Sequence, residues 1–228
     1  MATLQELVAQ YIGKGDPHGV RYEATLKMLQ SWIPSPCIIL DIGGSSCDNL
    51  AYVPLQRMME ALDYIVMPLN GPDLREPFPV ADNAFKFAIC TEVLEHIKDQ
   101  ECDPKDRFLG RCRQNLLKEI KRVIQPGGRI LLSTPNSCAL SNAHRLALGY
   151  TPLMYCLHQQ EISPGHLREL VRVAGLEVVH FTTQDVWGRF NMSDAKAEAW
   201  IRFFIEQGYS LHERGDCTMV ILGVPQCD

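Results

Sequence analysis

An apolar run ends at Asp41 and is followed by the small residues Gly43 and Gly44. This arrangement allows a ligand to bind the backbone after the run. The run, residues 38–40, is short, rich in β-branched side chains and preceded by Pro36, as is typical of a buried parallel strand. Glycine has no Cβ, so Gly43 and Gly44 let backbone N–H groups come close to a ligand at a strand-to-helix turn. We therefore predict a binding site here, although a glycine pair alone is more often an ordinary turn.

The composition is that of an ordinary globular protein and excludes several classes of partner. A length of 228 residues fits one large domain, with or without a small appended subdomain. The net charge of -5 argues against binding to nucleic acid through phosphate contacts. The amino terminus lacks the apolar core of a signal peptide, and no run approaches the about 20 apolar residues of a membrane-spanning helix. We expect neither a nucleic-acid nor a membrane partner.

The cysteines indicate a reducing compartment. The chain has nine of them, scattered and without a C-x-x-C pair. This spacing matches neither a zinc site nor the disulfide framework of a small secreted domain. We therefore expect a cytoplasmic protein with reduced thiols, no structural disulfide and no metal.

Strand-like and helix-like patterns alternate along the chain, which predicts a largely parallel sheet with helices on both faces. The predicted helices are residues 4–12, 21–32, 48–59, 115–124, 163–175 and 194–207. The predicted strands are residues 38–41, 63–69, 85–90, 129–134, 176–181 and 217–224.

Three regions are predicted from these patterns. Residues 1–34 form a helical cap, and residues 35–228 form the main domain. Within the main domain, residues 135–161 are irregular and rich in Asn, His and Tyr, so we interpret them as a lid or substrate-facing insertion.

Several stretches together resemble the class I S-adenosylmethionine-dependent methyltransferases. The first glycine motif of that family resembles the stretch ILDIGGSS of this chain. Its fourth-strand region resembles the stretch DNAFKFAICTEVLEHI, and its fifth-strand region resembles the stretch IKRVIQPGGRILLSTPN. A following stretch, HQQEISPGHLRELVRVAGLEVV, is similar to the subgroup that methylates small molecules and glycans. The resemblance spans about residues 22–224 and implies a Rossmann-like, doubly wound α/β fold whose last strand is antiparallel.

The resemblance also implies a cleft for S-adenosylmethionine at the carboxyl edge of the sheet. The residues that would orient and line the amino-acid end of the cofactor are Asp41, Gly43, Gly44 and Ser45. Thr91 and Glu92 would lie beside its adenosine and sulfonium. A competing interpretation places Glu92 and Glu95 at a solvated helix start, where the helix dipole favours carboxylates.

The glycine motif and the central strands depart from the family pattern. Ser45 and Cys47 occupy positions where the family has glycines, and Lys86 replaces a common acid. The segment between the second and third predicted strands is also short. One helix and one strand of the usual sheet are therefore expected to be missing or reduced to a loop.

A third departure concerns the ribose of the cofactor. The family ends its second strand with an acid that accepts two hydroxyl hydrogen bonds, and the corresponding position here is Pro68. Proline cannot accept them, so Asn70 or Asp73 is expected to supply part of the contact. Asp73 or Glu76 could instead face the adenine amino group.

Methyl transfer is a displacement at the sulfonium methyl, so the main contribution of the protein is to position the acceptor in line. A hydroxyl acceptor also has to lose a proton, which a neutral histidine can take. The candidates are His96, His144 and His158, with His158 favoured because it lies in the presumed insertion. A carboxylate acceptor needs no base. We expect methylation of a small molecule or sugar at oxygen.

Two alternatives remain at this level. Ser45, Pro68 and Lys86 also fit a non-catalytic, methyltransferase-like binding or partner domain that has lost strong cofactor affinity. A nicotinamide-dependent oxidoreductase fits less well, because G-x-G-x-x-G is absent and no acid follows at the ribose position. The sequence specifies neither the acceptor nor the oligomeric state.

Overall fold

The computed structural model describes residues 3–44, 52–69, 73–98, 111–155 and 157–226. Ser45 and Asn70, two of the predicted cofactor residues, lie outside the described residues, as does Cys47.

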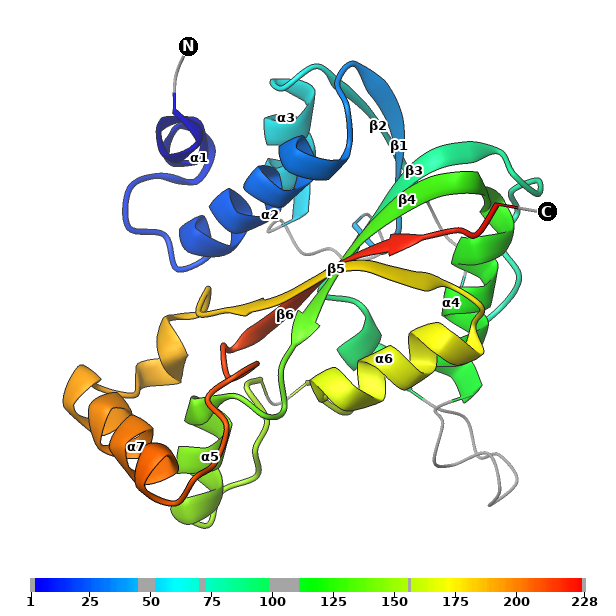
Figure 1. Cartoon of the computed structure of the whole chain (residues 1–228). Helices are drawn as coiled ribbons and strands as arrows, with labels where there is room; N and C mark the ends of the chain where they lie inside the picture. Colours follow the sequence, from blue (N-terminus) through cyan, green and yellow to red (C-terminus); the bar gives the residue numbers. More distant parts are fainter. Residues whose placement is uncertain (1–2, 45–51, 70–72, 99–110, 156, 227–228) are drawn as a thin grey trace.

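A mixed six-stranded sheet forms the centre of the described chain, in the order β2-β1-β3-β4-β6-β5 (Figure 1). Its strands are β1 (Cys37–Asp41), β2 (Tyr64–Pro68), β3 (Phe85–Thr91), β4 (Ile124–Pro135), β5 (Glu177–Gln184) and β6 (Cys217–Gly223). The pairs β2-β1, β1-β3 and β3-β4 are parallel, whereas β6 is antiparallel to both of its neighbours. The predicted doubly wound α/β fold with an antiparallel last strand is confirmed.

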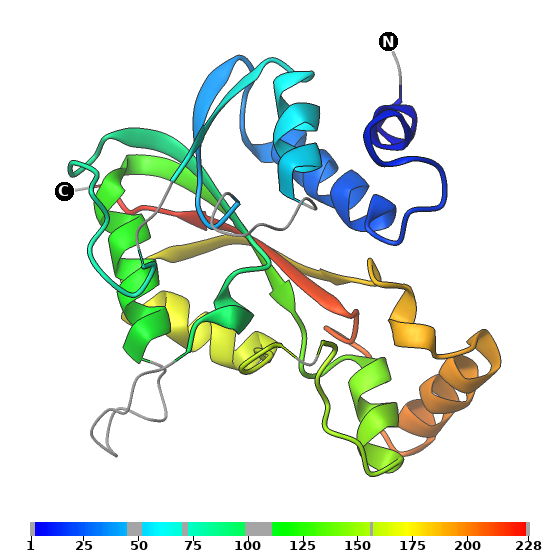
Figure 2. The same cartoon turned by 180° about the vertical axis from the view of Figure 1, so that it is seen from behind.

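Helices cover both faces of the sheet (Figures 1 and 2). They are α1 (Leu4–Ile12), α2 (Gly19–Trp32), α3 (Tyr52–Glu60), α4 (Arg111–Val123), α5 (Leu140–Ala147), α6 (Pro164–Val173) and α7 (Asp194–Glu206). Side chains of α1, α2 and α3 share one hydrophobic cluster with the sheet, and those of α4 and α6 share the other.

The two clusters follow from the alternation of side chains along each strand. Ile89 of β3 belongs to the cluster of α1, α2 and α3, and the next residue, Cys90, belongs to that of α4 and α6. Leu131 and Leu132 of β4 divide in the same way. Central strands that are buried on both faces therefore consist of continuous apolar runs, as the sequence shows.

The start and end of α6 agree with the sequence prediction. Ser163 caps the helix by accepting a hydrogen bond from the backbone N–H of His166 at 3.2 Å, and Pro164 follows in the first turn. Gly175 adopts φ +71° just after the helix, a conformation that glycine takes without strain.

The edge of the sheet beside β2 is reduced, as expected. Residues 73–84 contain neither a helix nor a strand, and β2 pairs only with β1 in the described chain. Lys86 lies near the start of β3, at the opposite end of that strand from Thr91. This departure from the family pattern therefore lies away from the carboxyl edge of the sheet.

Residues 125–128 were expected to form a turn before a strand, and this prediction is wrong in detail. They belong to β4, where the register with β3 shifts between Phe85 and Phe87. Gly127 has φ +74°, and its N–H donates to the Val224 carbonyl at 2.9 Å. A Cβ on Gly128 would lie 2.5 Å from the Lys86 carbonyl oxygen. Ile124 pairs with Phe85 and Arg129 pairs with Phe87, so residues 125–128 between them form a bulge that has no partners in the ladder with β3.

The insertion at residues 135–161 contains α5, which packs against α7 (Figure 1). Both helices lie beyond the carboxyl end of β4, apart from α1, α2 and α3 (Figures 1 and 2). Among the described residues, no helix combines the length and apolarity that crossing a membrane requires.

Candidate cofactor and acceptor site

Asp41 and the two glycines form a tight turn at the end of β1. The Asp41 side chain is buried, with 4% of its surface exposed, and its Oδ2 accepts a hydrogen bond from Gln56 Nε2 at 2.7 Å. A Cβ on Gly44 would lie 2.0 Å from this Oδ2, and one on Gly43 would lie 2.5 Å from Val93 Cγ2. Both positions therefore exclude larger residues.

The burial of Asp41 changes its acidity. Loss of solvation raises the pKa of this carboxyl to about 6, and the hydrogen bond from Gln56 opposes the rise. Sequence reasoning did not identify Gln56, which reaches Asp41 from α3.

The ends of β1, β2 and β3 come together beside this turn. Asp41 is in register with Pro68, and the Leu69 N–H donates to the Asp41 carbonyl at 2.9 Å. The Ile42 N–H donates to the Ile89 carbonyl at the same distance. Pro68 is thus the last residue of β2, where the family resemblance implied that a ribose acid is missing.

Asp73 is partly exposed and already has a partner. Its carboxylate accepts hydrogen bonds from the Arg75 side chain, at 2.8 and 2.9 Å from Nε, and from the Arg75 backbone at 3.0 Å. These hydrogen bonds lower the pKa of Asp73 to about 2. The Asp73 carboxylate is therefore ionised. A ribose hydroxyl that donates a hydrogen bond to it would have to share the carboxylate with Arg75 or displace the Arg75 side chain.

Glu92 is buried, and the interpretation of this residue as a solvated helix start is wrong. Its backbone adopts φ +56°, and its N–H donates to the Ser133 carbonyl at 2.9 Å. Its Oε1 accepts hydrogen bonds from the Ser133 hydroxyl at 2.8 Å and from Cys217 Sγ at 3.6 Å. The neighbouring Thr91 is also buried. A positive φ at a non-glycine residue is strained and is typical of functional positions.

Glu95 is completely buried, so the same interpretation is wrong for this residue too. Within the described residues 92–98, the short 3-10 turn Leu94–His96 follows β3. Glu95 Oε2 accepts a hydrogen bond from the Thr134 hydroxyl at 3.0 Å. Burial first, and then the nearby Glu92, raise the pKa of Glu95 well above its ordinary value.

Two of the three candidate histidines lie together beside Glu95. The rings of His96 and His158 meet edge to face with their centroids 4.9 Å apart. His158 Nδ1 lies 3.0 Å from Glu161 Oε1, within a buried pair. Burial lowers the pKa of His96, and His158 lowers it further, so the His96 ring is neutral near pH 7.

His144 belongs to a different contact. It lies on α5, where its Nδ1 accepts a hydrogen bond from Trp200 Nε1 of α7 at 2.9 Å. His96 therefore contacts His158, whereas His144 contacts Trp200 where α5 packs against α7.

Backbone contacts hold the insertion against the turn after β3. The N–H groups of Gln159 and Gln160 both donate to the Glu95 carbonyl, at 2.8 and 3.4 Å. The buried Arg113 donates to the Leu94 carbonyl at 3.0 Å and to the Gln160 side chain at 3.1 Å. The position of His158 beside Glu95 is thus maintained by hydrogen bonds on both sides.

Several residues of this site were missed by sequence reasoning. They are Gln56, Arg113, Ser133, Thr134, Asn142 and Glu161. A signal existed for Ser133 and Thr134, which end the strand that follows the proline-glycine-glycine stretch. The position of Glu161 three residues after His158 was a second signal.

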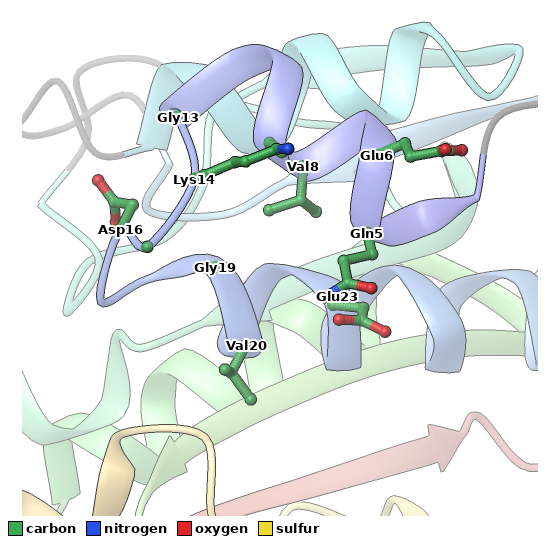
Figure 3. A pocket seen from close by; sticks show the side chains of 11 residues that line it. Gln5, Glu6, Val8, Gly13, Lys14, Asp16, Gly19, Val20 and Glu23 are labelled. Carbon is green, nitrogen blue, oxygen red and sulfur yellow. The ribbon is translucent and has the colours of Figure 1, made fainter.

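A separate hollow lies between α1 and α2 and has a volume of about 560 Å³ (Figure 3). Val8, Val20 and the charged side chains of Glu6, Lys14 and Glu23 line it. None of the predicted site residues contributes to its wall. The candidate site is therefore the carboxyl edge of the sheet.

Residues 20–181 match the family model of a methyltransferase domain. The chain belongs to this methyltransferase family. A probable S-adenosylmethionine-dependent methyltransferase of Mycolicibacterium smegmatis is 32% identical over 100 residues, which are 44% of this chain and 32% of that protein. The glycine/sarcosine/dimethylglycine N-methyltransferase of Actinopolyspora halophila is 28% identical over 142 residues, 60% of this chain and 22% of that protein. The chain thus spans less than a third of the length of either curated relative.

The fold of this methyltransferase-family chain is shared with solved structures. A crystal structure described as a methyltransferase from Bacillus halodurans C-125 matches with a TM-score of 0.55 and 15% identity, and the match covers 89% of this chain and 99% of that one. The sequence-based assignment to the S-adenosylmethionine-dependent methyltransferases is confirmed, and with it S-adenosylmethionine as the cofactor of the family.

Proposed function

We propose that this methyltransferase-family protein transfers a methyl group from S-adenosylmethionine to an oxygen of a small molecule or sugar. The observation that carries the proposal is the position of the two histidines beside Glu95, directly after β3, whose partner strand β1 ends in the Asp41 turn. The Asp41 turn, proposed to bind the cofactor, and the histidines, proposed to accept a proton, then lie at the same edge of the sheet.

The Asp41 turn fits the amino-acid end of the cofactor. A Cβ on Gly43 would clash with Val93 and one on Gly44 with Asp41, so the tight turn at the end of β1 requires both glycines. We assign Asp41, Gly43, Gly44 and Ser45 to this end and Thr91 and Glu92 to the adenosine and sulfonium region; Asn70 and Asp73 are the candidates for the ribose. When bound, the cofactor supplies an electrophilic methyl group on its sulfonium.

His158 and His96 are proposed to take the proton of a hydroxyl acceptor. The Glu161 carboxylate lies against His158 Nδ1, so the proton of the neutral ring is placed on Nδ1 and Nε2 is left as the acceptor. His144 is a weaker candidate, because its Nδ1 is engaged by Trp200.

The insertion supports an acceptor with an apolar part. Large apolar side chains of residues 146–157 are at least half exposed, namely Leu146, Leu148, Tyr150, Tyr155 and Leu157. The Tyr155 ring contacts the His158 ring, with centroids 5.5 Å apart. Exposed apolar groups beside a polar site are typical of a binding surface. We therefore propose that residues 135–161 face the acceptor.

The alternative is a methyltransferase-like domain that binds a partner without catalysis. Pro68 at the end of β2 and the Arg75 partner of Asp73 favour it, because both weaken the expected grip on the ribose.

Calorimetry with S-adenosylhomocysteine tests the cofactor site, and a labelled-methyl assay with a panel of hydroxyl-bearing small molecules and sugars tests the transfer. We expect binding by the wild type and a lower kcat for His158→Gln, whereas the exposed His212→Gln should behave as the wild type. Absence of binding at millimolar ligand would contradict the proposal. Binding without transfer to any acceptor class, nitrogen acceptors included, would favour the non-catalytic alternative.

A further inference from the structure

Three side chains of ligand-forming type converge at the end of β3. One ligand atom from each of Glu95, His96 and His158 lies within 4.8 Å of the other two. Glu95 Oε1 and His96 Nε2 are 3.9 Å apart. Bonds of about 2.0–2.1 Å to a tetrahedral zinc ion place two ligand atoms about 3.3 Å apart, so a small rotation of the His96 side chain would close the set.

Glu95 has an unused oxygen that points into this cluster. Its side chain is completely buried, and although Oε2 is bonded to Thr134, Oε1 has no hydrogen-bond partner among the described residues. Neither Glu95 nor Glu161 forms an ion pair with a lysine or an arginine in the part of the chain that the structure describes. Buried carboxylates are normally paired with a cation or bound to a metal. A bound cation would supply the partner that Glu95 Oε1 lacks among the described residues.

His158 is oriented as metal-binding histidines are. Its Nδ1 contacts Glu161 Oε1 at 3.0 Å, and Glu161 is itself held by the Asn142 side-chain amide at 2.8 Å and by the backbone N–H of Met154. A carboxylate on one ring nitrogen leaves the other nitrogen for a metal and fixes the ring plane.

We propose that Glu95, His96 and His158 bind a divalent transition-metal ion. Two imidazoles and one carboxylate suit Zn²⁺, Co²⁺, Fe²⁺ or Mn²⁺ rather than Mg²⁺, which prefers oxygen ligands and water. Three protein ligands leave at least one coordination position open, as in catalytic metal sites. The His96 side chain is 42% exposed, so the cluster can be reached from solvent at this residue.

The inference departs from the sequence-based expectation of no metal. That expectation rested on the spacing of the cysteines, whereas these ligands are a carboxylate and two histidines. His158 is far from Glu95 in the sequence, and the hydrogen bonds of Gln159 and Gln160 to the Glu95 carbonyl and of Arg113 to the Gln160 side chain hold the two segments together.

The catalytic role of this metal site rests on the proposed function. A divalent ion bound here would lower the pKa of a hydroxyl group that binds it, so that the proton of the hydroxyl could pass to water without a histidine base. The two histidines would then act as ligands, and oxygen-bearing acceptors would be favoured over amines.

The test is metal binding by the full chain without an affinity tag, after treatment with a chelator. We expect the wild type to bind one equivalent of Co²⁺ or Zn²⁺ in equilibrium dialysis. Glu95→Gln, His96→Gln and His158→Gln should each weaken binding by at least about tenfold, and Glu161→Gln by about 10–100-fold. The matched control His212→Gln should bind as the wild type does. His96 is partly exposed, so we expect His96→Gln to fold. Its metal binding can then be measured even if the variants at buried residues fail to fold.

Absence of one bound equivalent at millimolar Co²⁺ would overturn the proposal. Equal binding by the wild type and His96→Gln, or a Co²⁺ spectrum typical of thiolate ligands, would do the same. Calorimetry with S-adenosylhomocysteine in the presence of chelator separates this result from the proposed function. If the protein binds S-adenosylhomocysteine but no metal, only the metal site is refuted. If it does not bind S-adenosylhomocysteine, the transferase proposal is refuted.

Discussion

The hydroxyl of Ser133 donates a hydrogen bond to Glu92 Oε1 at 2.8 Å and so joins the end of β4 to the end of β3. Both residues are buried, and the Glu92 N–H returns a hydrogen bond to the Ser133 carbonyl at 2.9 Å. Glu92 is thereby held in its left-handed conformation at the edge where the cofactor and the acceptor are proposed to meet.

Replacement of Ser133 by alanine should destabilise the protein. The buried Glu92 oxygen would lose a donor, which costs about 1–3 kcal/mol in the free energy of unfolding. Urea denaturation measures this change. The matched control is Ser31→Ala, which removes an exposed hydroxyl bonded to the Lys27 carbonyl at 2.8 Å and should change stability by less than about 0.5 kcal/mol. Equal effects of the two substitutions would contradict the prediction.

Replacement of Gly44 by alanine should damage the Asp41 turn. The new Cβ would lie 2.0 Å from Asp41 Oδ2, so either the turn or the buried carboxylate has to move. We expect S-adenosylhomocysteine affinity to fall by at least about tenfold, as the loss of about one hydrogen bond would cause. Gly165→Ala is the control, since a Cβ there meets nothing within 4 Å. Calorimetry that finds wild-type affinity in Gly44→Ala would refute this role of the turn.

Asp41 should make the stability of the protein depend on pH. Because burial raises its pKa from 3.8 to about 6, the folded state holds this proton more tightly than the unfolded state does. The resulting stabilisation is complete below about pH 4 and is lost as the pH rises through 6, a change of about 3 kcal/mol at 1.36 kcal/mol per unit.

Asp41→Asn removes this titration. The difference in unfolding free energy, variant minus wild type, should therefore become more positive between pH 4 and pH 7, by up to about 3 kcal/mol. Denaturant titrations at several pH values measure it. A difference that stays constant across this range would show that Asp41 does not titrate as burial requires.

The ribose contact predicts a modest loss of cofactor affinity in Asp73→Ala or Asn70→Ala. One lost hydrogen bond corresponds to about a tenfold weaker Kd for S-adenosylmethionine. Asp82→Ala is a matched control, because Asp82 is an exposed carboxylate that is also paired with an arginine, Arg122, at 2.6 Å. Unchanged affinity in both Asp73→Ala and Asn70→Ala would refute compensation for Pro68.

The cysteines should differ in reactivity toward an alkylating reagent. Five described cysteines carry free thiols, Cys37, Cys90, Cys112, Cys138 and Cys217. Burial raises the pKa of the Cys90 and Cys217 thiols, so both should stay unmodified in the native protein. Among the described cysteines, the half-buried Cys138 should react before Cys90 and Cys217. Mass spectrometry without reductant measures the order, and rapid labelling of Cys90 in folded protein would contradict it.

The amino-acid sequence by itself determined the local features of this protein. The apolar run before Asp41, the Ser163 and Pro164 helix start and the alternation of elements depend on neighbouring residues, so periodicity and turn chemistry were sufficient to predict them. The motifs around Asp41 and Glu92 were also sufficient to indicate the family that the comparison confirms.

Only the tertiary structure decided which polar residues meet. Ser133 reaches Glu92 because β3 and β4 pair in a register in which Thr91 lies opposite Ser133. His158 reaches His96, and His144 does not join them, because the insertion is bonded through its backbone to the Glu95 carbonyl while α5 packs on α7. Such contacts join residues that are distant in the chain. They follow from strand register and long-range hydrogen bonds, which leave no periodic pattern in the sequence.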